Sequence, residues 1–417
     1  MSSKDDDDSC FFRTITLCNK IAGVWLEPKT SKNTRRTRFI IWDAILLSLA
    51  ITFFICEVLM VKHIISELKK LFKHLAMLAT HTVGMLKFLL IITHQKELAK
   101  IREILQDENL SYDCMTDCVD IPETARKFSN IISLTTYFLY CMVGTSAHIS
   151  ALRNLNAAVK EDQFGGNVTC YDFLPYLYVI PFKSDTANGC KNALITMDLG
   201  LCIFAGYIAS HDSMLYSAII CLRTRLEILT KATRSIRGRT INKLNLPKDF
   251  EPIRIDKLPE VEEELHTELK RCNGNLELLL SACRCIEEVF SYTILAQTIM
   301  SLLVIASCMF AASLMTYTDP ELYSLVEYAI AAVFQLLMVC HFGNSITEAG
   351  ETYRYCLYEI DWYSNSKRFK QCLLIMMYRM DKPLYLTIGK FSPLTLHTFV
   401  AVMKGSFSYA TVFKTVD

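Results

Sequence analysis

The sequence lacks the charge imbalance that would point to a highly charged partner. Its 44 basic and 43 acidic residues leave a formal net charge of +1 at pH 7, and charged residues make up only 21% of the 417 residues. The total charge therefore favours neither a nucleic acid nor an acidic partner. We predict that the protein binds no nucleic acid.

Motifs of metal binding and catalysis are missing as well. The 17 cysteines form no CxxC pairs and show no zinc-type spacing with histidine. No zinc helix motif, phosphate-binding loop or nucleophile elbow is present. We predict no metal, no cofactor and no enzymatic activity, and we interpret most cysteines as small apolar fillers between helices.

We also expect no cleavable signal peptide at the amino terminus. The first residues carry an acidic run, Asp5 to Asp8, where a signal peptide would have positive charge and an apolar core. The first membrane span is therefore expected to act as its own insertion signal.

The sequence does contain long apolar stretches. Hydrophobic residues make up 52% of the chain, and the mean hydropathy is +0.25, above the roughly 45–50% apolar content of ordinary soluble domains. A helix that crosses the hydrocarbon core needs about 20 mostly apolar residues. Seven stretches qualify, which predicts an all-α polytopic membrane protein; they are 39–61, 75–93, 130–150, 192–221, 289–316, 322–347 and 384–413.

Basic residues between these spans predict the orientation. The segments that would lie on the side of the amino terminus hold 32 Lys and Arg residues, against 9 on the other side. Basic residues are retained in the cytoplasm. We therefore expect a cytoplasmic amino terminus and an extracellular carboxyl terminus, the reverse of a G-protein-coupled receptor.

Segment 151–191 is predicted to be the outer loop between spans three and four. It contains the glycosylation sequon Asn167-Val168-Thr169, which agrees with an outside location. Cys170 and Cys190 lie in the same segment and could close a 21-residue loop by a disulfide, or could remain free thiols.

The rest of the chain divides around the spans. A cytoplasmic tail, 1–38, precedes spans one to four at 39–221, and a mixed-charge cytoplasmic segment, 222–288, precedes spans five to seven at 289–413. Near-helical leucine spacing after Val261 predicts that the fifth span begins as a cytoplasmic helix, unless this stretch is a solvated linker. Pro383 predicts that the last helix is broken into a short inner piece and the span 384–413.

Small side chains form a stripe on the last span. The stripe recurs in steps of three and four, so its members share one side of a helix; they are Ala401, Gly405, Ser408, Val412 and Val416. Such a stripe is typical of tight helix packing or of a pore wall that narrows to an apolar ring. Lys404 could face the lumen of such a pore, or could pair with a carboxylate or carbonyl oxygen inside the bundle.

The carboxyl-terminal quarter resembles the insect odorant receptors. The similarity covers residues 342–416 and includes Lys382-Pro383-Leu384, Gly389-Lys390-Phe391 and the Ser-x-Ser-Tyr element ending at Tyr409, at family spacing. Gustatory relatives end in a different signature, and the shared co-receptor has an inner segment longer than the 67 residues at 222–288. The resemblance thus implies an odour-tuned subunit that assembles with the co-receptor into a tetrameric, non-selective cation channel opened by volatile ligands.

The same resemblance assigns the stripe on the last span to the channel wall. The family's gate is an apolar ring near the outer end, which falls on Val412, with Val416 one turn further out. A narrow apolar ring sheds water and so blocks hydrated ions.

A volatile ligand needs an apolar pocket with one or two polar anchors. Family pockets lie in the outer halves of the spans, and the residues that we expect at this level are Met77, His81, Tyr137, Thr145, His148, Met197, Leu201, Phe204, Phe310, Tyr323 and Tyr328. For any one of them helix packing is a more common role than ligand contact, and the two hydroxyl-bearing residues Tyr323 and Tyr328 are the favoured anchors. The alternatives to an odorant receptor are a gustatory-type homotetrameric channel and a small-molecule transporter.

Overall fold

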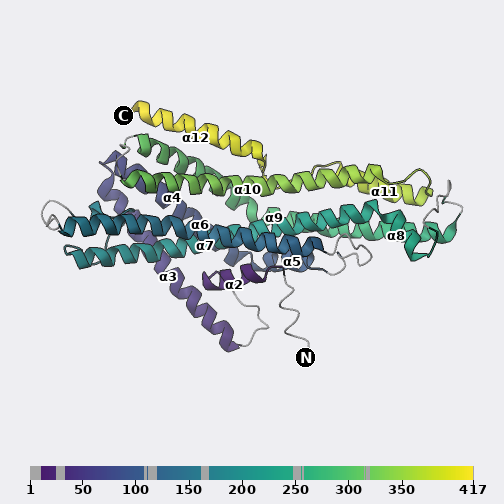
Figure 1. Ribbon diagram of the computed structural model, residues 1–417, viewed down its shortest axis with the longest axis horizontal. Coiled ribbons are helices and arrows are strands. Elements are labelled where there is room, and N and C mark those ends of the chain that lie inside the picture. The colour runs from purple at the N-terminus through teal and green to yellow at the C-terminus, as the bar shows by residue number, and fades with distance from the viewer. Residues whose placement is uncertain are drawn as a thin grey trace.

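The computed structural model describes residues 11–24, 33–107, 110, 120–160, 169–247, 255, 258–313, 315 and 320–416, and most of these residues are helical. The elements are, in chain order, α2 (Arg13–Ile21), α3 (Asn33–Ile64), α4 (Leu68–Thr93), α5 (Gln95–Leu105), α6 (Asp120–Lys160), η3 (Cys170–Asp172), α7 (Ala187–Arg234), α8 (Ile236–Lys243), α9 (Pro259–Ser313), α10 (Pro320–Glu359), α11 (Lys367–Met380), β1 (Thr387–Ile388), β2 (Ser392–Pro393) and α12 (Leu396–Val416). Figure 1 shows an elongated bundle in which α3 is inclined to the other long helices and α12 lies at one edge.

Helix length and composition agree with the predicted spans. Five helices of the described residues are long and apolar enough to cross a membrane, and they lie in α3, α4, α7, α9 and α10. Each contains most or all of one predicted span. The predicted spans 130–150 and 384–413 correspond to α6, which has 41 residues, and to α12, which has 21.

Helix α7 is the centre of the bundle. It makes its most extensive contacts with α6 and α10 and also packs against α4 and α9. Every residue from Tyr207 to Leu222 is buried. A helix that is buried on all sides cannot be amphipathic in the usual way, so its polar side chains must find partners within the protein.

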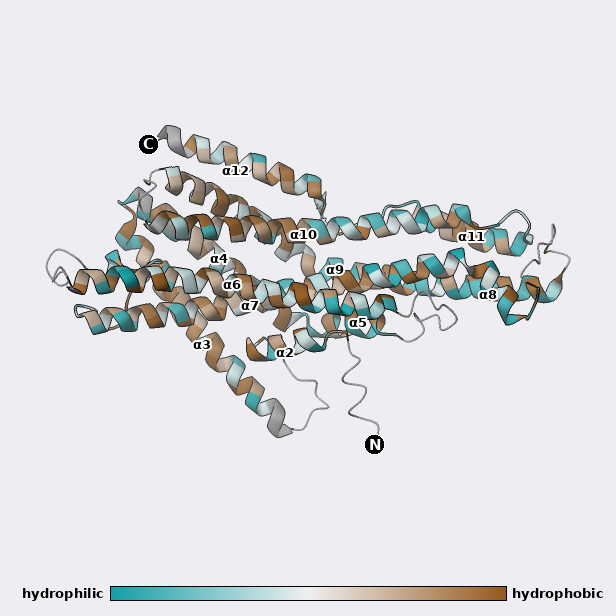
Figure 2. Cartoon of the chain, in the orientation of Figure 1, coloured by the Kyte–Doolittle hydropathy of each residue, from teal (hydrophilic) through white to brown (hydrophobic). Residues whose placement is uncertain are grey.

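The bundle has two different ends. At one, which we call the disulfide end, Cys170 near the start of the loop before α7 is bonded to Cys190 in the first turn of α7, with their Cα atoms 5.4 Å apart. At the other end, the last part of α7, α8, the first half of α9, the end of α10 and α11 form what we call the polar arm (Figure 1). Figure 2 shows apolar residues gathered toward the disulfide end and many more hydrophilic residues along the polar arm.

Ion pairs tie the polar arm together. Arg234 binds Glu359 at 2.7 Å, and Arg368 binds Glu263 at 2.8 Å. The hydrogen bond to Glu359 raises the pKa of Arg234 above its ordinary value. Inside the arm, the apolar residues at near-helical spacing on α9 are buried at Val261, Leu265, Leu269, Leu276 and Leu279, and Leu280 is half-buried. The fifth span therefore does continue from a preceding helix, as one 55-residue helix that begins at Pro259.

The start of the last predicted span was wrong. Residues 384–395 are not helical, because β1 and β2 pair as an antiparallel hairpin and α12 begins only at Leu396. Gly389 and Lys390 both have positive φ, at 58° and 65°, which suits the tight three-residue turn between the two strands and cannot continue a helix. The break after α11, which Pro383 predicted, therefore contains a hairpin that packs on α9, where the Gly389 N–H donates to the Ser291 carbonyl at 3.0 Å.

Candidate ligand cavity and the exposed face of α12

A cavity of about 110 Å³ lies inside the bundle toward the disulfide end. Helices α4, α6, α7, α9 and α10 form its walls, and Tyr176 lines it from the loop before α7. An apolar cavity of about 150 Å³ is large enough for benzene. The space observed here therefore suits a small molecule, and a longer one requires its walls to move apart.

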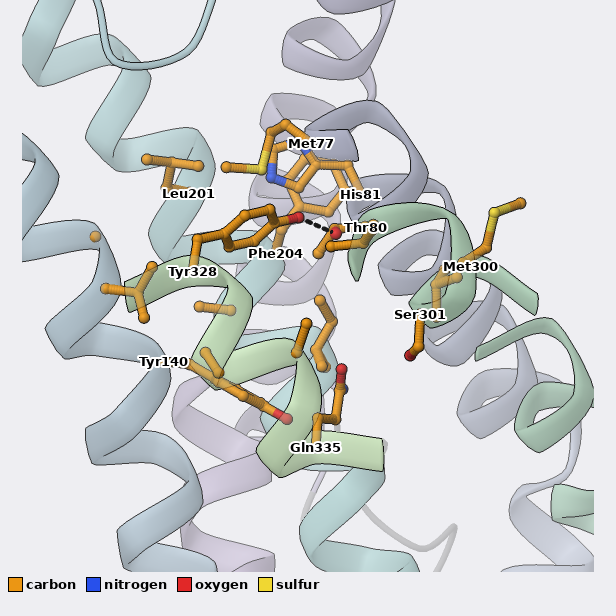
Figure 3. A pocket seen from close by; sticks show the side chains of 18 of the residues that line it. Met77, Thr80, His81, Tyr140, Leu201, Phe204, Met300, Ser301, Tyr328 and Gln335 are labelled. Carbon is orange, nitrogen blue, oxygen red and sulfur yellow. Dashed lines mark hydrogen bonds between the residues drawn. The ribbon is translucent and has the colours of Figure 1, made fainter. Parts of the chain in front are cut away.

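An aromatic stack forms one wall. The rings of His81 and Phe204 lie face to face with centroids 4.2 Å apart, as seen in Figure 3. Nδ1 of His81 lies 2.8 and 2.7 Å from the two carboxylate oxygens of the fully buried Glu57. Glu57 thereby holds the imidazole ring in place beside the cavity.

Two tyrosines separate this cavity from a smaller one of about 40 Å³ that lies on the side of the loop before α7. Tyr176 and Tyr328 line both spaces, and their ring centroids are 6.4 Å apart in an edge-to-face arrangement. The hydroxyls of Tyr328 and Thr80 are hydrogen-bonded to each other (Figure 3). Burial raises the pKa of the Tyr176 hydroxyl, so this side chain stays neutral at physiological pH. The partition between the two spaces is thus uncharged and aromatic.

The cavity floor is a buried polar network centred on Asp212. Lys87 donates to its Oδ1 at 2.5 Å, and neither side chain has any exposed surface. Oδ2 accepts from the Tyr140 hydroxyl at 3.1 Å and from the Gln335 amide at 2.7 Å. An isolated buried charge would be very costly, and the opposite charge and the extra donors offset that cost. Four helices, α4, α6, α7 and α10, are joined at this one carboxylate.

The structure brings together some of the residues expected from the sequence and separates others. Five of the eleven line the cavity, namely Met77, His81, Leu201, Phe204 and Tyr328. The other six have different environments. Three have polar partners: Tyr137 is hydrogen-bonded to Ser210, Thr145 to carbonyls of its own helix, and His148 is paired with Asp198 at 2.5 Å. Of the remaining three, Met197 is fully buried, Phe310 packs on Phe72 and Tyr323 is 71% exposed.

Several cavity residues were not expected. Thr80, Tyr140, Gln297, Ser301 and Gln335 add polar side chains to the lining, and Tyr176 comes from a loop. The two glutamines interrupt long apolar runs of α9 and α10, which is the sequence signal that could have drawn attention to them.

Most of the described part of the predicted stripe on α12 is exposed. Ala401, Lys404 and Ser408 are exposed and Val412 is 53% exposed, whereas Gly405 is half-buried. The opposite side carries the buried Val402, Ser406 and Ala410, and the Ser406 hydroxyl lies 3.4 Å from the Leu302 carbonyl of α9. The side chain of Val416 and the sequon residue Asn167 lie outside the described residues.

Comparison with known proteins places these features in a family. The family model described as 7tm Odorant receptor matches residues 67–407. Odorant receptor 2a of Drosophila melanogaster is 26% identical over 353 residues, covering 82% of this chain and 81% of that protein, and Odorant receptor Or1 of Anopheles gambiae is 23% identical over 166 residues, covering 39% and 40%. The solved structure of the insect olfactory receptor OR5 from Machilis hrabei in complex with eugenol superposes with a TM-score of 0.77 at 13% identity, covering 99% of this chain and all of that one.

Proposed function

The chain belongs to the 7tm odorant receptor family, and on that premise we propose that it is the odour-tuned, ligand-binding subunit of a ligand-gated, non-selective cation channel. Members of this family are receptors and not enzymes. The observation that carries the proposal is the buried, largely apolar cavity between five helices. A cavity of this kind, with few polar groups, suits a small volatile organic molecule.

Helix α9 offers the route from the cavity to the pore. Its residues Met300 and Ser301 line the cavity, and the adjacent Leu302 contacts α12, where a side chain added at Gly405 would lie 3.4 Å from the Leu302 methyl group. Packed interfaces transmit small displacements because they are dense and nearly incompressible. A ligand that pushes α9 outward therefore displaces α12 as well.

Helix α12 is proposed to line the pore, with Val412 as part of the gate. An apolar ring that dewets blocks cations without filling the opening, so a small dilation is enough for conduction. The exposure of Ala401, Ser408 and Val412 supports this role, since side chains that line a pore are not buried in the core of their own subunit.

The orientation proposed is a cytoplasmic amino terminus, with the cavity in the outer half of the membrane. The excess of basic residues on one side supports it, as does the Cys170–Cys190 disulfide, which is typical of an oxidising exterior. The receptor is proposed to reside as a multi-pass protein in the plasma membrane of a sensory dendrite.

Electrophysiology tests the function. The chain is expressed with and without an odorant co-receptor, and a panel of volatile esters, alcohols and terpenoids is applied under voltage clamp. Ligand-evoked cation current that requires both subunits is the expected result. Current from this chain alone would favour the gustatory-type homotetramer, and ligand uptake without a channel conductance would favour a transporter.

A further inference from the structure

The cavity of about 40 Å³, from here on the second cavity, adjoins the ligand cavity of about 110 Å³ on the side of the loop before α7. Serines from three helices line it, namely Ser150 of α6, Ser307 of α9 and Ser324 of α10. Asn154 and Asp172 also line it and are exposed, whereas no described residue that lines the ligand cavity is exposed. Of the two spaces, the second cavity is therefore the one that reaches the protein surface.

The loop that carries Tyr176 is anchored on both sides of this residue. Before it, Cys170 is bonded to Cys190 of α7. After it, the buried Tyr178 donates its hydroxyl hydrogen to the Ala193 carbonyl of α7 at 2.9 Å. The backbone around Tyr176 is thus fixed, and the ring of this residue stands between the two cavities.

The two rings of the partition are held differently. The Tyr328 hydroxyl is hydrogen-bonded to Thr80 and donates to the Ala76 carbonyl at 3.2 Å. The Tyr176 hydroxyl has no hydrogen bond to any described residue. A rotation of Tyr328 would therefore break two hydrogen bonds, whereas a rotation of Tyr176 breaks none. Tyr176 is the part of the partition that moves at the lower cost.

The other borders of the two cavities are closed. At the floor, a ligand would have to separate Lys87 from Asp212, an ion pair with no exposed surface, and that is costly. Toward the lipid, an apolar groove between α9 and α10 shares Cys308 and Leu325 with the second cavity, but both side chains are buried and stand between the two spaces.

We propose that the second cavity is a vestibule through which a small volatile ligand enters from the outer aqueous side, and that the ring of Tyr176 turns to admit it to the ligand cavity. The proposal rests on the proposed function, because it describes how the same ligand reaches the same cavity. Serine hydroxyls beside aromatic rings suit a brief stay of a molecule that is mostly apolar and carries one polar group.

An obstacle in an entry route has a kinetic signature. It slows entry and exit by the same factor, so the dissociation constant, which is the ratio of the two rate constants, does not change. A residue that contacts the bound ligand instead changes the dissociation constant, mainly through the dissociation rate.

The test places a removable obstacle in the vestibule. Ser150→Cys, at a half-buried position that lines only the second cavity, is treated on intact cells with a membrane-impermeant, negatively charged methanethiosulfonate. Asn156→Cys, at an exposed position of α6 that lines neither cavity, is the matched control, and treated wild type gives the background of the native cysteines. Ser324→Cys repeats the test from the opposite wall.

Two readouts are taken before and after the reagent. The first is the onset and decay of current with the co-receptor at a sub-saturating pulse of an active ligand. The second is the exchange rate of that ligand with the purified full-length chain, measured from ligand line broadening by NMR.

We expect labelled Ser150→Cys to slow onset, decay and exchange together, by about tenfold, with the half-saturating concentration kept within about twofold. Labelled Asn156→Cys should match wild type, and a reductant should reverse the effect. Tyr176→Ala should act in the opposite direction and raise the exchange rate.

Three results would overturn the vestibule. The reagent could fail to label Ser150→Cys from outside, the labelled protein could keep its wild-type rates, which would mean entry from the lipid, or only the dissociation rate could change, which would make Ser150 a ligand contact. The readouts also separate this proposal from the channel. Slower exchange without any ligand-evoked current would support the vestibule and contradict the channel, whereas ligand-evoked current with unaltered rates would do the reverse.

Discussion

The cavity region and α12 differ in how far one chain by itself buries and pairs their side chains. Around the cavity, side chains from α4, α7, α9 and α10 are buried, and the ion pair of Lys87 with Asp212 has no exposed surface. On α12, by contrast, Phe407, Tyr409 and Val412 are each more than half exposed. The proposed ligand site is therefore complete within one subunit, whereas the proposed pore helix needs surroundings that one subunit does not supply.

Lipid could cover part of α12, but it does not suit the whole of its exposed surface. Lys404 and Ser408 are exposed on the same face as Ala401. A charged group within a span is costly in hydrocarbon and usually faces protein or water. This face is thus better suited to other subunits and to a water-filled lumen, while the aromatic Phe407 and Tyr409 can meet lipid or a neighbouring chain.

The variant with the largest expected effect tests whether the stability of the cavity region depends on the buried ion pair of Lys87 and Asp212. Asp212→Leu leaves the Lys87 ammonium buried without its counter-charge, which should lower stability by about 3–5 kcal/mol. We expect loss of most folded receptor, measured as the monodisperse fraction and unfolding temperature of the full chain in detergent.

The matched variant is the double change Lys87→Met with Asp212→Leu, which removes both charges and should recover most of the lost stability. If the single variant is as stable as wild type, the ion pair does not hold the floor of the cavity, and the contrast with α12 loses its main support.

Composition and periodicity were sufficient to predict the helices but not the side-chain contacts between them. Runs of apolar residues predicted the spans because each span must satisfy its own backbone in lipid. The partner of Lys87 lies 125 positions away on another helix, and nothing in the local pattern selects Asp212 over Asp198. The hairpin before α12 escaped prediction because its apolar residues continue the run, and the positive φ of Lys390 is a rare conformation for a lysine.

The cavity residues show the same limit. The outer-half rule gives the depth of a residue in the membrane but not the direction in which its side chain points. Tyr323 and Tyr328 are five positions apart, which separates them by about 140° around a helix, so both could not face one cavity. Tyr328 faces inward and Tyr323 is exposed.

The second prediction uses these two tyrosines to test where the wall of the proposed ligand region lies. Tyr328→Ala removes a ring shared by both cavities and a hydroxyl bonded to Thr80. We expect the half-maximal concentration of an active ligand to rise about tenfold, the equivalent of about 1.4 kcal/mol, with surface expression retained. The measurement is a dose response under voltage clamp, together with surface labelling.

Tyr323→Ala is the matched control, because it removes the same side chain from the same helix outside the cavity. Its dose response should stay within about twofold of wild type, since exposed substitutions usually change little. Similar shifts for both variants would mean that the wall of the ligand region is not where the cavity lies.

The smallest effect on the chain itself is expected on α12. Val412 is 53% exposed, so Val412→Ala should change the unfolding temperature of the isolated subunit very little, within about 0.5 kcal/mol. In the assembled channel the same change widens a proposed apolar ring and weakens its dewetting, so basal current with the co-receptor should rise or ion selectivity should change.

Val400→Ala, at another half-exposed valine of α12 that lies about a third of a turn from the stripe, is the control and should leave basal current unaltered. Unchanged leak and selectivity in Val412→Ala would remove this residue from the gate, whereas a large loss of subunit stability would show that α12 is not the incomplete region that its exposed face implies.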